Sequence, residues 1–177
     1  GDDEFAFAQM VDYSCDHKLD YMIVAGDVLH RKRNIAAPVN FFRLQMDKLR
    51  EHHVRFGFIQ GQHEAQEYPW CSSVHEWPEW LDLAKQGLDH PKKPDFRIIG
   101  RYNLRGIDWT PRSDLAGRLV KVPEGTDILV MHQVCHQWMG GITQPELALE
   151  DVPHVRLLLI GDYHKHDKAR VRGRQGQ

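Results

Sequence analysis

The sequence predicts an α/β fold in which a layered sheet sandwich is flanked by helices. The main observation is that short apolar runs, suited to buried strands, alternate with segments whose apolar residues recur at helical spacing. A second observation is that four of the apolar runs lead directly into glycine or polar residues. Strands that alternate with helices along a chain are typical of parallel sheets with helices packed on their faces.

The first half of the chain contains two predicted helix–strand pairs. Residues 3–17 are predicted to be helical because apolar residues recur there at three-residue steps after an acidic first turn. Tyr21–Ala25 follows as a strand that is apolar on both faces and stops at a glycine. An apolar stripe predicts a second helix over residues 37–52, and Val54–Ile59 is the next strand candidate.

The second half is predicted to contain one more helix and several strands. Tryptophans and a leucine at helical spacing predict a helix over residues 76–87, which a loop rich in proline and lysine follows. The remaining strand candidates are Phe96–Ile99, Arg118–Val122, Ile128–Met131 and Val155–Ile160.

The composition is that of one ordinary globular domain. The chain has 177 residues, a formal net charge of −2 and 41% hydrophobic residues, which excludes a fully disordered chain. Its apolar runs are far shorter than the roughly 20 residues that a membrane-spanning helix needs. Three widely spaced cysteines argue against a disulfide scaffold and favour a reducing compartment, so a cytoplasmic location is expected.

Side chains that can bind metals follow four of the predicted strands. Because sites in open α/β sheets form at the carboxyl ends of strands, we expect these side chains to lie close together. They are Asp27, Gln62, His63, His132, Asp162 and His164. Oxygen and imidazole ligands without cysteine disfavour a structural zinc site and suit Mn²⁺, Mg²⁺, Fe²⁺ or catalytic Zn²⁺. Two such ions can clamp a phosphoryl group and activate a water molecule.

Several of these residues, taken alone, also have an ordinary structural explanation. Asp27 follows a glycine at a strand end, where an aspartate is often only a helix cap. His63 can be an exposed loop residue, and His164 can belong to a polar loop before a basic tail. The same pattern at four strand ends favours a site over these separate explanations.

The order of the motifs resembles the calcineurin-like metallophosphoesterases, and within them the SbcD-type DNA-repair nuclease subunits most of all. The similar segments are Gly26–His30 with the helix that follows it, Gly61–Glu64, Ile128–Gln133 and Leu157–Lys165. The resemblance extends over nearly the whole chain. It implies a binuclear metal centre that hydrolyses DNA phosphodiester bonds.

The resemblance implies a role for each candidate residue. Asp27 would bridge both metal ions, and Gln62 stands at the position of an asparagine ligand. His132 and Asp162 would bind the second ion, and His164 would bind the first. The implied catalytic residues are His63, which would stabilise the transition state or donate a proton, and His30, near the scissile phosphate.

The sequence departs from the family pattern at three points. Gln62 replaces an asparagine and is one methylene longer. Asp162 replaces a histidine, which makes the site harder and favours Mn²⁺, with Mg²⁺ as the alternative, over Zn²⁺. The family's opening strand with its Asp-x-His motif is missing, so residues 1–177 are expected to form a catalytic domain that is incomplete at both ends.

The resemblance also implies partners. DNA is the expected substrate, an SbcC-type coiled-coil ATPase the expected partner subunit, and a homodimer the expected assembly. Arg31, Lys32, Arg33 and Lys165 are candidate contacts to the DNA backbone, although a terminal run of basic residues is usually only solvated. Two other functions stay open: hydrolysis of another phosphoester by a phosphodiesterase or phosphatase, and a non-catalytic subunit that keeps the fold.

Overall fold

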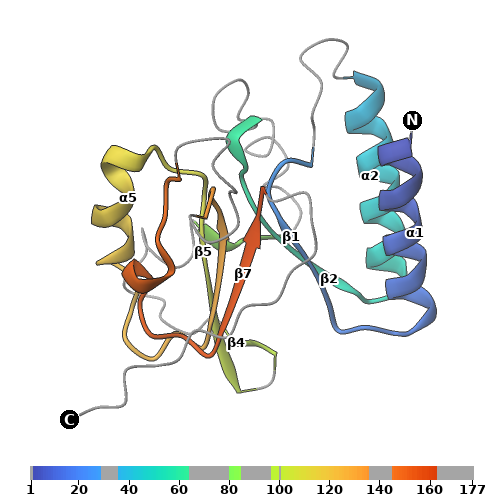
Figure 1. Ribbon diagram of the computed structural model, residues 1–177. Coiled ribbons are helices and arrows are strands. Elements are labelled where there is room, and N and C mark those ends of the chain that lie inside the picture. The colour runs from blue at the N-terminus through green and yellow to red at the C-terminus, as the bar shows by residue number, and fades with distance from the viewer. Residues whose placement is uncertain are drawn as a thin grey trace.

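The computed structural model describes residues 2–28, 36–63, 80–84, 97–99, 101–135 and 145–162. Figure 1 shows the elements, which in chain order are α1 (Asp2–Asp16), β1 (Tyr21–Ala25), α2 (Ala36–Glu51), β2 (Arg55–Ile59), β3 (Trp80–Asp82), β4 (Arg97–Ile99), β5 (Tyr102–Ile107), α5 (Arg112–Leu119), β6 (Ile128–His132), the 3-10 turn Leu149–Asp151 and β7 (Leu157–Gly161).

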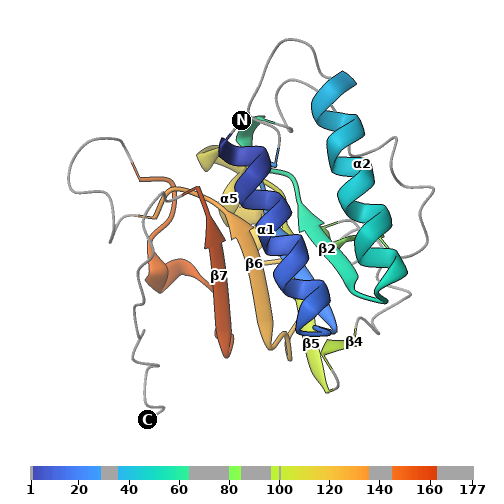
Figure 2. The same cartoon turned by 90° about the vertical axis from the view of Figure 1, so that its right-hand side faces the viewer.

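The strands form two sheets. One has three parallel strands in the order β1-β2-β3. The other has four strands in the order β4-β5-β6-β7, in which β5, β6 and β7 are parallel and β4 is an antiparallel edge strand. Strands β6 and β7 of this sheet run side by side in Figure 2. The register pairs Ala25 with Ile59 and His132 with Gly161, so neighbouring strands end level with each other.

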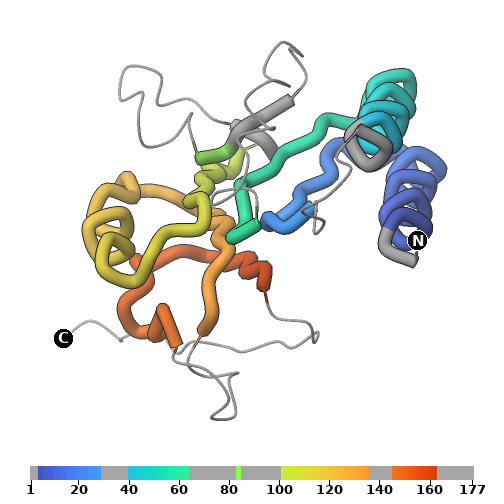
Figure 3. Tube along the Cα trace, turned by 90° about the horizontal axis from the view of Figure 1, so that it is seen from above, coloured from blue at the N-terminus to red at the C-terminus, as the bar shows by residue number. Residues whose placement is uncertain are grey.

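The sheets are stacked, and helices cover their outer faces. Phe56 of β2 packs with residues of α1 and α2 in one apolar cluster. Along β6, Ile128 and Val130 contribute to a cluster between the sheets, whereas Leu129 and Met131 contribute to a cluster beneath α5. Figure 3 shows the resulting order, with α1 and α2 on one side of the strands and α5 on the other. The predicted layered α/β fold is confirmed.

The structure places most of the predicted elements within about two residues of their expected bounds, but two predictions are wrong. Trp80–Asp82, expected in a helix over 76–87, is strand β3, because its backbone pairs in parallel with β2. Of that range, only residues 80–84 are described, and Leu83 and Ala84 are helical as predicted. Arg118 and Leu119, expected in a strand, end helix α5, since the four-residue spacing of Leu115 and Leu119 buries both against the second sheet.

Strand β5 and helix α5 were not predicted. The strand has the sequence YNLRGI, in which polar residues interrupt the apolar run that marks the other strands. Among the described residues, no helix combines the length and the apolar character that crossing a bilayer requires.

Candidate metal centre

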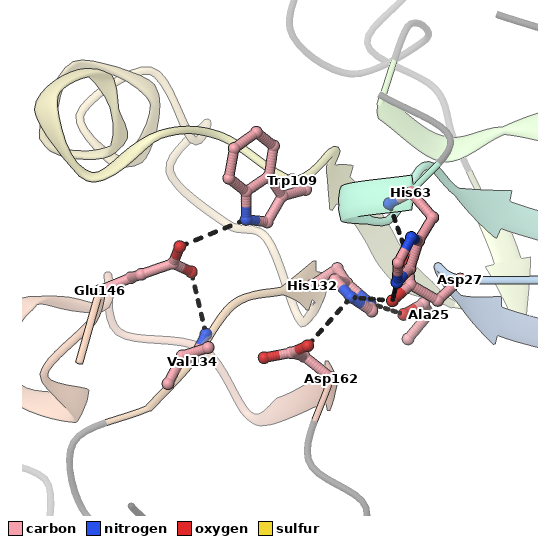
Figure 4. Close-up of polar contacts among 8 residues, drawn as sticks. All are labelled: Ala25, Asp27, His63, Trp109, His132, Val134, Glu146 and Asp162. Carbon is pink, nitrogen blue, oxygen red and sulfur yellow. Dashed lines mark hydrogen bonds and ion pairs between the residues drawn. The ribbon is translucent and has the colours of Figure 1, made fainter. Parts of the chain in front are cut away.

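The ends of β1, β6 and β7 bring Asp27, His132 and Asp162 together. His132 Nε2 lies 3.1 Å from Asp27 Oδ2 and 3.5 Å from Asp162 Oδ1. One ligand atom from each of these residues lies within 4.8 Å of the others, an arrangement that could hold a metal ion. Asp27 follows the first sheet, and His132 and Asp162 lie at the end of the second, so the group forms where the two sheets meet (Figure 4).

Strand β6 and a backbone carbonyl group fix the orientation of His132. The side chain is only 2% exposed, and by strand alternation it lies on the same face as Ile128 and Val130, between the sheets. Its Nδ1 lies 2.7 Å from the carbonyl oxygen of Ala25. Because a carbonyl oxygen only accepts, Nδ1 carries a proton and donates it. In the neutral tautomer the lone pair is therefore on Nε2, which faces the carboxylates.

The surroundings of His132 Nε2 fit a cation. This buried atom has no hydrogen-bond partner of good geometry within the described part of the chain, although two carboxylate oxygens lie close to it. A lone pair that faces two carboxylates is repelled by them, so either a proton or a metal ion is needed between them. Histidines that bind metals commonly donate their other ring N–H to a carbonyl oxygen, as His132 does to Ala25.

Without a metal ion, a proton takes this place. Burial alone would lower the pKa of His132, but the carboxylates of Asp162 and Asp27, with the carbonyl of Ala25, raise it to about 10. Burial would likewise raise the pKa of Asp27, yet the imidazole of His132 and the backbone N–H of His63 keep it below its usual value. A metal ion that binds Nε2 must therefore displace a tightly held proton.

Metal affinity is expected to rise steeply with pH. Because one proton leaves Nε2 for each ion bound, the association constant for Mn²⁺ should increase about tenfold per pH unit between about pH 7 and 9. Titration calorimetry in buffers of different ionisation enthalpy measures the released proton. The matched control His52→Gln removes an exposed histidine that follows α2, and it should leave the slope unchanged. A flat pH profile for the unsubstituted protein would contradict the role of Nε2.

The segment after β2 carries His63 to the same group. The backbone N–H of His63 donates to Asp27 Oδ1 at 3.1 Å, and its Nε2 lies 4.0 Å from Asp27 Oδ2. Asp27 and Asp162 have φ angles of 51° and 82°, in the left-handed region that non-glycine residues rarely occupy. Two residues with strained backbones whose carboxylates lie in one cluster are typical of a functional site.

Two glycines let the sheets approach closely enough to form the group. A Cβ atom on Gly26 would lie 2.6 Å from Nδ1 of His132, and one on Gly161 would lie 1.9 Å from the carbonyl oxygen of Ala25. Neither distance is compatible with a real side chain. Gly26 also has a φ angle of 82°, which glycine adopts without strain.

Of the predicted site residues, the structure brings together Asp27, His63, His132 and Asp162. Gln62 precedes His63 and has an exposed side chain, so its role as a ligand stays a prediction. The other predicted site residues lie outside the described residues: His30, Arg31, Lys32, Arg33, His164 and Lys165.

One polar residue at this edge was not apparent from the sequence pattern. Asp108 directly follows β5, and its Oδ1 accepts the backbone N–H of Gln60 at 2.7 Å, three residues before His63. An aspartate directly after a strand would have marked it as a candidate, but β5 itself was not predicted.

Comparison with known proteins supports the resemblance. The DNA double-strand break repair protein Mre11 of Methanosarcina acetivorans is 26% identical over 176 residues, covering 94% of this chain and 27% of the relative. The protein of the same name from Haloferax volcanii is 25% identical over 173 residues, covering 95% of this chain and 37% of the relative. No protein-family model matches the sequence.

The chain thus spans about 27% and 37% of the lengths of these two relatives. Both similarities extend over nearly the whole chain, and so take in most of the segment that carries the candidate site. The predicted resemblance to the SbcD-type DNA-repair nuclease subunits is confirmed, since both relatives are DNA double-strand break repair proteins.

Proposed function

We propose that this chain is the metal-binding part of a DNA-repair nuclease of the SbcD and Mre11 type, with residues 1–177 inside its catalytic domain. The observation that carries the proposal is the buried imidazole of His132, whose Nε2 lies between the carboxylates of Asp27 and Asp162. The two similar proteins are named as DNA double-strand break repair proteins, which supports DNA as the substrate.

In this proposal the ligands come from both sheets. Asp27 would bridge two divalent ions, because it has two oxygens: Oδ2 faces His132, and Oδ1 is steadied by the N–H of His63. His132 and Asp162 would bind one ion, and Gln62 and His164 would complete the ligand set. The carboxylate of Asp162 favours Mn²⁺, with Mg²⁺ as the alternative.

Bound divalent ions would lower the pKa of an attacking water and offset charge on the phosphoryl oxygens. His63 would act on the substrate itself. Its side chain is 31% exposed, so the imidazole can meet a phosphodiester while its backbone N–H holds Asp27. It would stabilise negative charge in the transition state or protonate the leaving oxygen, with His30 assisting near the scissile phosphate.

The proposed partners follow from the same resemblance. DNA would be held along its backbone by Arg31, Lys32, Arg33 and Lys165, through contacts to phosphates. An SbcC-type coiled-coil ATPase would be the partner subunit, the protein would act as a homodimer, and it would work in the cytoplasm.

Replacement of His63 tests the proposed function. His63→Ala is expected to lower kcat for Mn²⁺-dependent cleavage of linear duplex DNA by about 100-fold or more, because a positioned acid contributes about that much. Calorimetric binding of Mn²⁺ should persist, since Asp27, His132 and Asp162 remain. His53→Ala, at an exposed position before β2, is the control and should cleave DNA normally.

The same assay separates the alternatives. Hydrolysis of p-nitrophenyl phosphate esters without any cleavage of DNA would indicate a phosphodiesterase or phosphatase of other specificity. Absence of Mn²⁺ binding to the intact protein would indicate a non-catalytic subunit that keeps the fold. Either result would overturn the proposed nuclease activity.

A further inference from the structure

Residues 108 and 109 hold the segment that leads to His63. The backbone N–H of Gln60 donates to Asp108 Oδ1 at 2.7 Å, and the backbone N–H of Trp109 donates to the carbonyl oxygen of Gln60 at 2.8 Å. Gln60 follows β2 of the first sheet, whereas Asp108 and Trp109 follow β5 of the second. The backbone N–H and carbonyl group of Gln60 are thus both hydrogen-bonded to residues that directly follow a strand of the opposite sheet.

This attachment lies next to the candidate metal centre. Gln60 precedes Gly61, whose backbone packs so tightly on Asp27 that an added Cβ would lie 2.2 Å from Asp27 Oδ1. Two residues later the N–H of His63 donates to the same oxygen at 3.1 Å. A shift of Gln60 would therefore move Gly61 and the N–H of His63, which both lie against Oδ1 of Asp27.

The other side of the attachment reaches the segment just after β6, the strand that carries His132. Trp109 Nε1 donates to Glu146 Oε1 at 3.3 Å, and the backbone N–H of Val134 donates to Glu146 Oε2 at 3.1 Å (Figure 4). The backbone N–H of Glu146 donates in turn to the carbonyl oxygen of Val134 at 2.9 Å. Val134 is two residues beyond His132, so one chain of hydrogen bonds links the segments on both sides of the centre.

We propose that Asp108 is a positioning residue for the candidate metal centre. Asp108 fixes the distance between Asp27 and His132. Asp27 is held by the segment 60–63 and His132 by β6, and Trp109 and Glu146 complete the link between them. Asp108 does not touch the metal or the substrate in this scheme; it acts through the backbone of Gln60. The inference rests on the proposed function, since it assigns Asp108 to the same site.

The chain offers a matched control at the opposite end of β5. Asp127 Oδ2 accepts the backbone N–H of Asn103 at 2.9 Å, and the backbone N–H of Asp127 donates to the carbonyl oxygen of Asn103 at 2.9 Å. Asp127 therefore holds one residue from both sides, as Asp108 and Trp109 hold Gln60. It does so at the amino end of β6, whereas the centre lies at the carboxyl end. Removal of its carboxylate should affect stability but not the centre.

The test compares Asp108→Ala, Asp108→Asn and Asp127→Ala in the intact protein. Mn²⁺ dissociation constants are measured by electron paramagnetic resonance of the free ion, and backbone hydrogen exchange of residues 60–63 is measured without metal. Asp108→Ala should weaken Mn²⁺ binding about tenfold or more, as loss of an outer-shell partner does, and should speed the exchange. Asp108→Asn keeps an oxygen acceptor and should restore most of the affinity. Asp127→Ala should change neither quantity.

Equal Mn²⁺ affinities for Asp108→Ala and Asp127→Ala would overturn the positioning role, as would unchanged exchange at residues 60–63. These outcomes can be distinguished from a failure of the proposed function. If the unsubstituted protein binds no Mn²⁺, the proposed nuclease centre fails, while faster exchange in Asp108→Ala would still show that Asp108 holds the segment. Comparable loss of affinity in Asp108→Asn and Asp108→Ala would mean that the charge of Asp108, not its hydrogen bond, matters, and would also reject the inference.

Discussion

Asp27→Asn is expected to abolish metal binding and to lower Mn²⁺-dependent DNA cleavage by about a thousandfold or more. The Asp27 carboxylate lies 3.1 Å from His132 Nε2 and accepts the N–H of His63, so it is the residue that joins the two sides of the centre. Loss of metal assistance removes several kcal/mol of transition-state stabilisation, and each 1.4 kcal/mol is about tenfold in rate. The measurements are titration calorimetry with Mn²⁺ and cleavage of linear duplex DNA.

Asparagine is the right replacement because it has the shape of aspartate and tolerates the φ angle of 51° at this position. Circular dichroism should therefore show an intact fold. Asp12→Asn removes an exposed carboxylate that pairs with Lys48, and it should leave both metal binding and cleavage unchanged. Normal Mn²⁺ binding by Asp27→Asn would show that this carboxylate is not a ligand.

Gly161→Ala is expected to destabilise the protein by about 3 kcal/mol or more. The added Cβ would lie 1.9 Å from the carbonyl oxygen of Ala25 and 2.8 Å from Nδ1 of His132, so the sheets would have to separate where the centre forms. Backbone atoms cannot rotate away as a flexible side chain can. Urea unfolding at neutral pH measures the free-energy change.

Gly117→Ala is the matched control for that experiment. Gly117 lies inside α5, and beyond the neighbouring backbone of its own helix an added Cβ would have no heavy atom within 4 Å. Because alanine favours the helical conformation more than glycine does, this substitution should stabilise the protein by about 0.5–1 kcal/mol. Effects of the same sign and size for the two substitutions would contradict the close approach of the sheets at Gly161.

The sequence predicted the strands that are apolar throughout and, through them, the edge where the centre lies. Tyr21–Ala25 and Ile128–Met131 are such apolar runs. Strand β6 is buried throughout, and the two faces of β1 contribute to different apolar clusters. Because their ends are fixed by the apolar run, Asp27 and His132 could be placed at one edge without knowledge of the pairing order.

Other features could not be predicted, because they depend on contacts between distant segments. Strand β3 exists only through its pairing with β2, and three residues are too short for a periodic pattern. The need for glycine at position 161 comes from Ala25, which is 136 residues earlier in the chain (161 − 25) and belongs to the other sheet. Likewise, the partner of Asp108 is the backbone of Gln60, which no side-chain pattern encodes.

The candidate centre draws its side chains from two sheets whose described strands do not pair with each other. An ion bound there would cross-link the halves of the sandwich, in the way that a disulfide staples two segments. An ion present at a hundred times its dissociation constant adds about 2.7 kcal/mol to folding stability. The midpoint of thermal unfolding should then rise with the concentration of free ion. Loss of the ion would remove this cross-link at the edge where Asp27 meets His132.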